Sequence, residues 1–255
     1  MSHPNDMTTW EAIGCQRGHV EHSTRLVTVE LGGPTGYRDL PPIPEQHARR
    51  FKMEVWDPDA HPVDGGPYCP AHDAVSETIA TLGVWEPCET TLTLAVCSTA
   101  APGSVVLDYG AQIGWFTLLA ASCGIDVLAV DADADNLRLI QASAKRNAWD
   151  AIVHTSHARV GPDSTPAAPA ERVRLVKIDV EGAEGEVVRC LWPSIEAGLV
   201  DHLLGAVSPV FAGYYPDLVA DLVDAGYEAW MMPPKRTPPV PFRSLPLHLE
   251  PYRID

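Results

Sequence analysis

The stretch SVVLDYGAQIGWFTLLAASCGIDVLAVDADAD, residues 104–135, predicts a strand, a glycine turn, a helix and a second strand. An apolar run ending at Asp108 is typical of a buried strand, and apolar side chains at helical spacing follow the turn. The second apolar run ends at Asp131. Because such a unit offers helix N–H groups and a strand-end acid to a ligand, the first hypothesis is a nucleoside cofactor.

The glycine turn indicates which nucleoside to expect. A dinucleotide site carries G-x-G-x-x-G, in which the second glycine lets a pyrophosphate lie against the helix. Here the order is Asp108-x-Gly110-x-x-x-Gly114, and an acid at the mouth of the strand would repel phosphate and attract an ammonium group. S-adenosylmethionine carries that ammonium, and Asp131 suits its ribose hydroxyls. The pattern resembles the first motif of class I methyltransferases, with an unrelated α/β turn as the alternative.

Composition limits the classes of protein to consider. The 255 residues, 45% hydrophobic, suffice for one α/β domain with added segments. A formal charge of −16 works against nucleic acid as a partner, since binding to phosphates needs clustered Lys and Arg. There is no long apolar run and no basic leader, so we expect a cytoplasmic protein without a membrane partner.

Cysteine and histidine positions predict neither disulfides nor a metal site. The six cysteines are irregularly spaced and form no C-x-x-C pair. Three short motifs invite a metal interpretation, but none completes a set of three or four ligands: His19 with His22, Cys69 with His72, and His154 with His157.

The chain divides into two parts at about residue 70. Residues 1–70 are rich in Pro, Gly and charge, with two strand-like pieces at 26–31 and 51–56, and we expect an N-terminal extension. It would form either a cap over the substrate or a structural flank. Residues 71–255 form the predicted cofactor domain, which opens with one helix stopped by Gly83 and another started by Pro87.

A second informative stretch is VRLVKIDVEGAE, residues 173–184, which predicts a strand ending in acids and then a helix. Because parallel strands point their carboxyl ends at one edge of a sheet, Asp179 should face the same crevice as Asp108 and Asp131. The alternative is that Asp179 and Glu181 only cap and start the helix, which would stabilise it by about 1 kcal/mol. Later strands are predicted at 152–157, 199–207 and 227–232, and one more around 245–249.

Three stretches together resemble the FkbM family of S-adenosylmethionine-dependent methyltransferases: GVWE at 83–86, VLDYGAQIGWFT at 106–117 and LVKIDVEGAE at 175–184. The resemblance covers residues 71–232 and implies an α/β class I methyltransferase fold, a Rossmann-like sheet with helices on both faces. It implies methyl transfer, most often to an oxygen of a small natural product or sugar. Two departures are Ala206, where family members often have glutamate, and residues 1–70, which match nothing in the family.

The resemblance, together with the positions of side chains at strand ends, gives the candidate site residues. Asp179, Glu181 and His157 are the candidate catalytic residues. The candidate cofactor-binding residues are Glu86, Asp108, Gly110, Ala111, Gly114, Phe116, Thr117, Asp131, Ala132 and Asp179.

The acceptor decides what the acids do. An alcohol must lose a proton, and a carboxylate or imidazole within hydrogen-bond reach would take it. Asp179 is the favoured base, with Glu181, His154 and His157 next by strand-end position. An amine or carboxylate acceptor needs only orientation, so N- or carboxyl-methylation of a small metabolite is an alternative. A non-catalytic S-adenosylmethionine-binding protein, a nicotinamide dehydrogenase and a nucleic-acid methyltransferase are others. The oligomeric state stays open between monomer and homodimer.

Overall fold

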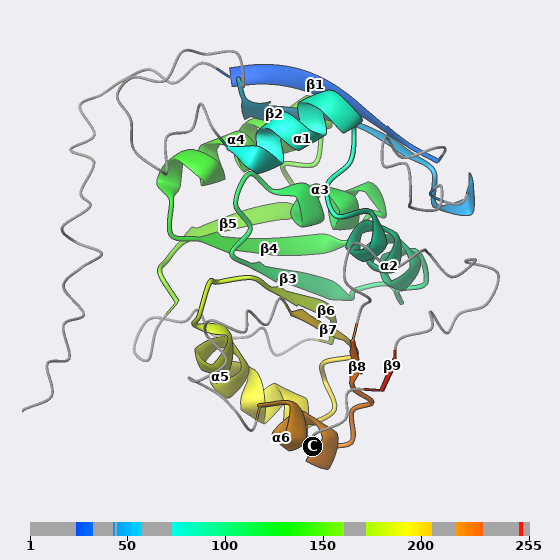
Figure 1. The fold of residues 1–255 in the computed structure, drawn as a ribbon, viewed down its shortest axis with the longest axis vertical. Helices are drawn as coiled ribbons and strands as arrows, with labels where there is room; N and C mark the ends of the chain where they lie inside the picture. The colour runs from blue at the N-terminus through cyan, green and yellow to red at the C-terminus, as the bar shows by residue number, and fades with distance from the viewer. Residues whose placement is uncertain are drawn as a thin grey trace, which may run out of the picture.

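A parallel sheet covered by helices on both faces forms the body of the molecule (Figure 1). The computed structural model describes residues 24–32, 43, 45–57, 73–160, 172–205, 218–231 and 250–251. Within these residues the α/β class and the Rossmann-like sheet expected from the sequence are confirmed.

The sheet has the strand order of a doubly wound fold. Its strands are β3 (Val105–Tyr109), β4 (Asp126–Asp131), β5 (Val153–His157), β6 (Val173–Ile178) and β7 (Leu203–Gly205). They are parallel and lie in the order β5-β4-β3-β6-β7. The chain therefore builds outward from β3 to β5 and then crosses to the other side of β3. Ligands of such sheets bind beyond the carboxyl ends of the strands where the order reverses, here between β3 and β6.

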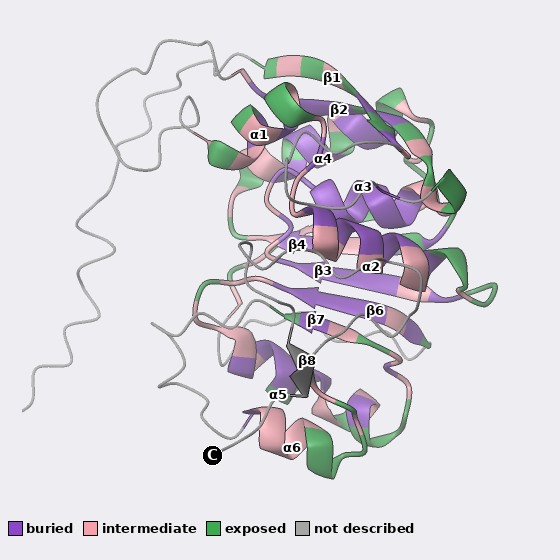
Figure 2. Cartoon of the chain, turned by 45° about the vertical axis from the view of Figure 1, so that its right-hand side comes forward, coloured by how far each residue is buried: buried purple, intermediate pink, exposed green. Residues whose placement is uncertain are grey.

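Alternation along the strands explains how both faces are buried. Val106, Val127 and Leu175 pack on the side of α2 (Pro87–Ser98), α3 (Trp115–Ser122) and α4 (Ala134–Arg146). Leu107 and Val176 pack on the opposite side, against α5 (Glu184–Glu196) and α6 (Leu218–Asp224). The interior strands are buried along most of their length (Figure 2), as expected for a parallel sheet covered twice.

The predicted helix signals are found where the sequence places them. In α1 (Ala74–Leu82) the Asp73 carboxylate caps the start by accepting from the Ser76 N–H at 2.7 Å. Gly83 ends the helix in the left-handed conformation at φ 73°, and its N–H donates to the Ile79 carbonyl. Pro87 is the first residue of α2.

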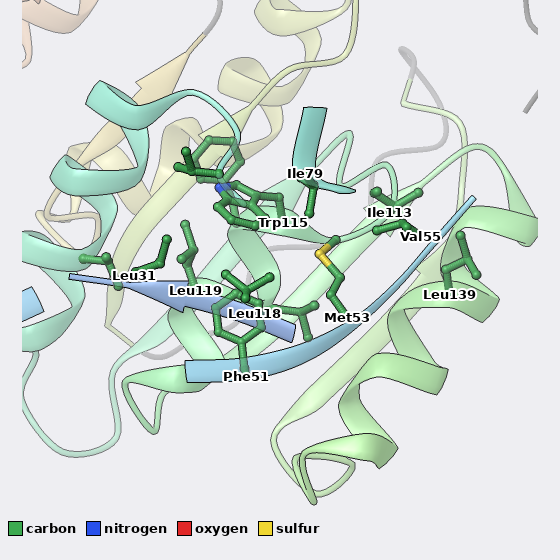
Figure 3. Packing of buried hydrophobic residues seen from close by; sticks show 14 of the residues in the cluster. Leu31, Phe51, Met53, Val55, Ile79, Ile113, Trp115, Leu118, Leu119 and Leu139 are labelled. Carbon is green, nitrogen blue, oxygen red and sulfur yellow. The ribbon is translucent and has the colours of Figure 1, made fainter. Parts of the chain in front are cut away.

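The two N-terminal strands form a third layer outside the helices. β1 (Thr24–Leu31) and β2 (Arg49–Trp56) pair antiparallel and lie on the far side of α1, α3 and α4 from the sheet (Figure 1). Phe51, Met53 and Val55 enter one apolar cluster with Leu118 and Leu119 of α3 (Figure 3). Both strand predictions are thus confirmed. A cap over the substrate stays a prediction for the rest of residues 1–70.

Helix side chains satisfy the outer edge of β2. Three alternate backbone N–H groups donate to side-chain oxygens: Lys52 to Asn147 (2.8 Å), Glu54 to Ser143 (2.8 Å) and Trp56 to Ser76 (3.1 Å). The buried Glu54 carboxylate also meets the Arg146 guanidinium at 2.8 Å. These bonds fix the register of β2 on α4 and α1, and they occupy an edge that could otherwise pair with another strand.

The C-terminal strands differ from the prediction. Of the strand expected at 199–207, the described residues 199–205 contain β7, which starts at Leu203 and is preceded by an isolated bridge between Val173 and Val200. The strand expected at 227–232 is reduced to β8 (Trp230–Met231), which pairs with β9 (Glu250–Pro251) in a separate antiparallel sheet. Proline has no backbone N–H to donate to a neighbouring strand, so the proline-rich sequence that follows β8 disfavours a strand in the interior of the sheet.

Some predictions fall outside the described residues: the pairs His19 with His22 and Cys69 with His72, the position Ala206, and the strand at 245–249. Among the helices that are described, none is both long enough and apolar enough to cross a membrane.

Candidate functional site

The turn after β3 is pressed against the end of β6. Gly110 has φ 75°, and a Cβ on it would overlap the carbonyl oxygen of Asp179. Gly114, the residue before α3, has φ 88°, and a Cβ on it would lie 2.6 Å from Cγ1 of Ile140. Both positions therefore require glycine for backbone conformation and for packing within the protein. The sequence predicted these glycines for a different reason, the approach of a ligand.

Strained backbone gathers at the same edge. Glu86, Gln112 and Glu181 have φ of 42°, 49° and 51°, although none is glycine, and each costs about 1 kcal/mol or more. Gln112 lies in the turn and Glu181 follows β6. Glu86 precedes α2, whose first turn is tied to the start of α3, because Trp115 Nε1 donates to Thr90 Oγ1 at 2.8 Å. Three residues in unfavourable conformations thus lie in loops at the carboxyl edge of the sheet, where sheets of this kind form their ligand crevice, and such strain is typical of a functional site.

Asp131, the last residue of β4, is held in place by backbone donors. Its Oδ2 accepts from the Gln112 N–H and its Oδ1 from the Asp133 N–H, both at 2.8 Å. Burial raises the pKa of this carboxyl against the opposing effect of those donors. Oδ1 also accepts from Nδ2 of Asn136 at 3.4 Å, so Oδ2 keeps a lone pair for one ribose hydroxyl, and the second hydroxyl would take the place of the long Asn136 bond. The side chain is half-buried and fits the predicted ribose contact.

Asp108 lies beneath the turn. Only 1% of the residue is exposed, and its Oδ2 accepts from Thr117 Oγ1 in the first turn of α3 at 2.6 Å. Burial raises the pKa of Asp108 to about 6, although the Thr117 hydrogen bond and the nearby Lys177 lower it. The sequence placed this acid at the mouth of the strand. In the structure it is buried at the end of β3 and tied by its hydrogen bond to the fully buried Thr117 at the start of α3.

The residue that sequence reasoning missed is Lys177. It lies opposite Asp108 in the β3–β6 register and is 4% exposed. Its Nζ donates to Oδ2 of Asp179 at 3.0 Å and lies 4.9 Å from the centre of the Phe116 ring. A lysine flanked by Val176 and Ile178 in a central strand, two residues before a strand-end acid, was the signal available in the sequence.

Asp179 and Glu181 face outward from the end of β6. The Asp179 side chain is 41% exposed, and its backbone N–H donates to the Tyr109 carbonyl at 3.0 Å. Glu181 is exposed. The helix-capping alternative does not hold, because α5 begins at Glu184 after Ala183, without a side-chain cap.

His157 lies away from these acids. It ends β5, at the edge of the sheet, and its Nε2 is 3.0 Å from the Ala132 carbonyl oxygen. β5 is three strands from β6, which at about 4.8 Å per strand is roughly 14 Å. The structure therefore brings His157 to the Asp131 side of the crevice and not to Asp179. His154 pairs with Leu128, farther from the carboxyl ends of the strands.

Metal-ligating side chains do not cluster in the part of the chain that the structure describes. No group of three or more His, Cys, Asp or Glu residues there could hold an ion.

Comparisons with known proteins give distant similarities. No protein-family model and no curated protein sequence matches the chain. A precorrin-6Y C5,15-methyltransferase from Geobacter metallireducens is 15% identical, with TM-score 0.42, over 60% of this chain and 78% of that one. A ribosomal protein L11 methylase from Lactobacillus delbrueckii subsp. bulgaricus is 14% identical, with TM-score 0.41, over 60% and 76%.

A geranyl diphosphate methyltransferase, solved with GPP and sinefungin, is 20% identical with TM-score 0.34, over 41% of this chain. The match spans 38% of that methyltransferase, and 35% of a SAM-dependent methyltransferase from Thiobacillus denitrificans. None of these structures points to the FkbM family in particular. At such identities and TM-scores, function rests on this chain's own site.

Proposed function

We propose that this chain is a class I S-adenosylmethionine-dependent methyltransferase that methylates an oxygen of a small molecule, such as a natural product or a sugar. The observation that carries the proposal is the Asp131 carboxylate. Two backbone N–H groups fix it at the end of β4, beside a turn without the second glycine of a dinucleotide site. It lies at the carboxyl edge of the sheet, one strand from the reversal of strand order between β3 and β6 where ligands of doubly wound sheets bind.

Different residues would bind different parts of the cofactor. S-adenosylmethionine, when bound, supplies a methyl group activated on a sulfonium. Asp131 would receive the ribose, with Ala132 beside it. The turn is rigid, because the N–H groups of Gly110 and Ala111 both donate to the Val130 carbonyl, at 2.8 and 3.1 Å. Asp108, Thr117 and Phe116 hold the turn from beneath, and Gly114 and Glu86 border it.

Asp179 and Glu181 would serve the acceptor. In-line transfer gains most of its rate from holding the acceptor oxygen and the methyl group in line. A hydroxyl acceptor also gives up a proton to a carboxylate within hydrogen-bond reach. Asp179 is the favoured base because it is exposed at the end of β6 and fixed by Lys177, and Glu181 follows it. His157 would reach only a part of the acceptor lying toward β5.

We also propose membership of the FkbM family. The three stretches that resemble the family supply Glu86, the turn of residues 108–114, and the acids after β6, all of which border the same crevice. The formal charge of −16 favours a small acceptor over a nucleic acid.

Methyl transfer itself is the test. The protein is incubated with S-adenosylmethionine carrying a trideuterated methyl group and a panel of small alcohols, sugars, amines and acids, and products are followed by mass spectrometry. A labelled product bearing the methyl on oxygen, formed more slowly by Asp179→Asn, supports the proposal. Label on nitrogen or on a carboxylate would favour the alternative acceptors. Binding without any labelled product would favour a non-catalytic role.

A further inference from the structure

The buried ammonium of Lys177 lies immediately below the proposed site of methyl transfer. Nothing in the proposed reaction gives it a direct contact with a ligand, since only 4% of the residue is exposed. A lysine in a central strand is costly to bury unless its charge is paired. We therefore ask which neighbouring group the Lys177 ammonium pairs with and stabilises.

The surroundings of Lys177 identify that partner. Its Nζ donates to Asp179 Oδ2 at 3.0 Å, while the Phe116 ring packs 4.9 Å from the ammonium on the α3 side. Across the β3–β6 register lies Asp108, which accepts from the Thr117 hydroxyl and interacts with the Lys177 charge, whereas the hydrogen bond from Nζ of Lys177 goes to Asp179. The aromatic ring and the neighbouring strand confine the ammonium, and the ammonium in turn confines Asp179 at the mouth of the crevice.

We propose that Lys177 is a positioning residue with two effects: it fixes the Asp179 carboxylate, and it offsets the negative charge of that carboxylate where the methyl group is transferred. The inference rests on the proposed function. Transfer removes the positive charge of the sulfonium. A fixed ammonium nearby raises the free energy of the charged cofactor relative to the neutral product. An unpaired Asp179 carboxylate would instead stabilise the charged cofactor and so slow the transfer.

The affinity ratio of two ligands measures this effect without turnover. S-adenosylmethionine is a sulfonium cation and S-adenosylhomocysteine is its uncharged thioether, and they share every other group. Damage to folding or to the ribose site weakens both, whereas a change of charge near the sulfonium alters their ratio. A unit charge about 10 Å away, at an effective dielectric of about 20, corresponds to a change of about tenfold in that ratio.

The experiment is calorimetry with both ligands on the full chain. Lys177→Met, which keeps the length of the side chain without its charge, should shift the ratio about tenfold toward S-adenosylmethionine. Asp179→Asn should shift it in the opposite direction. The double variant should return near the wild-type ratio, and Lys177→Arg should stay near it. Lys145→Met, the same change on the exposed last turn of α4, should leave the ratio unchanged.

The outcomes separate the inference from the proposed function. The role of Lys177 is overturned if Lys177→Met weakens the binding of both ligands equally. In that case its affinity ratio equals that of the wild type and of Lys145→Met. If Lys177→Met lowers the unfolding temperature, Asp179→Asn tests the same ion pair through its other member. An unchanged affinity ratio in Asp179→Asn overturns the inference as well. A wild-type protein that binds neither ligand refutes the proposed function itself.

Discussion

Replacing Asp108 by Asn should remove a pH dependence of stability that the wild-type protein has. Burial raises the pKa of Asp108 in the folded protein to about 6, from an ordinary value of 3.8. The folded state therefore binds this proton more tightly than the unfolded chain does. The resulting stabilisation is fully present below pH 3.8 and is lost as the pH rises through 6. A difference of about two pH units corresponds to about 3 kcal/mol.

The assay is urea unfolding of wild type and Asp108→Asn at several pH values from about 4 to 8. Asn keeps the shape and an acceptor oxygen for the Thr117 hydroxyl, and it does not ionise. Other titrating groups are shared and cancel in the difference between the two proteins. The wild type should lose up to about 3 kcal/mol relative to the variant as the pH rises. In Thr117→Val, the pH at which this stabilisation is lost should be higher than in the wild type. The hydrogen bond from Thr117 lowers the pKa of Asp108, so removing the bond lets that pKa rise. A difference that is flat across this range would refute the reasoning.

Three further predictions concern the fold and the site. Gly110→Ala should destabilise the protein by several kcal/mol, of the order expected for severe backbone strain and overpacking, because its Cβ would overlap the Asp179 carbonyl; chemical unfolding checks this, and an unchanged midpoint would contradict the close packing. Met53→Ala should cost about 2–5 kcal/mol, because Met53 of β2 is fully buried in the cluster shared with α3; a loss under about 1 kcal/mol would show that the strands are not part of the core. Ser143→Ala should cost about 1–3 kcal/mol by leaving the Glu54 N–H without its buried acceptor, and native-state hydrogen exchange at Glu54 should speed up; unchanged protection there would argue against the bond.

The elements with strong local signals were predictable. Residues 104–135 carry a buried apolar run, a glycine turn and helical spacing in sequence, and all were found. α1 and α2 were bounded by Gly83 and Pro87, whose backbone preferences act within one turn. The strand at 227–232 was predicted, but its pairing in a separate sheet was not, because whether a short apolar run joins the main sheet depends on the path of the chain around it.

The site was predictable only as far as strand ends. The position of Asp131 follows from its place as the last residue of a strand, which the sequence marks. The burial of Asp108 does not follow from the sequence, because it depends on how α3 packs over β3 and brings Thr117 to the carboxylate. The pairing of Lys177 with its neighbours depends on register between strands that are distant in sequence. The distance between His157 and Asp179 could not be predicted either, because strand order cannot be read from spacing, and the role of His157 stays a prediction.

The binding of S-adenosylhomocysteine to the wild-type protein, measured by titration calorimetry beside Asp131→Asn, tests the central claim most directly. The geometry at the end of β4 predicts one site per chain and a loss of roughly tenfold or more in the variant, since a charged acceptor of the ribose hydroxyls becomes neutral. No heat with the wild type, or equal affinity in the two proteins, would contradict the claim that this crevice holds the nucleoside.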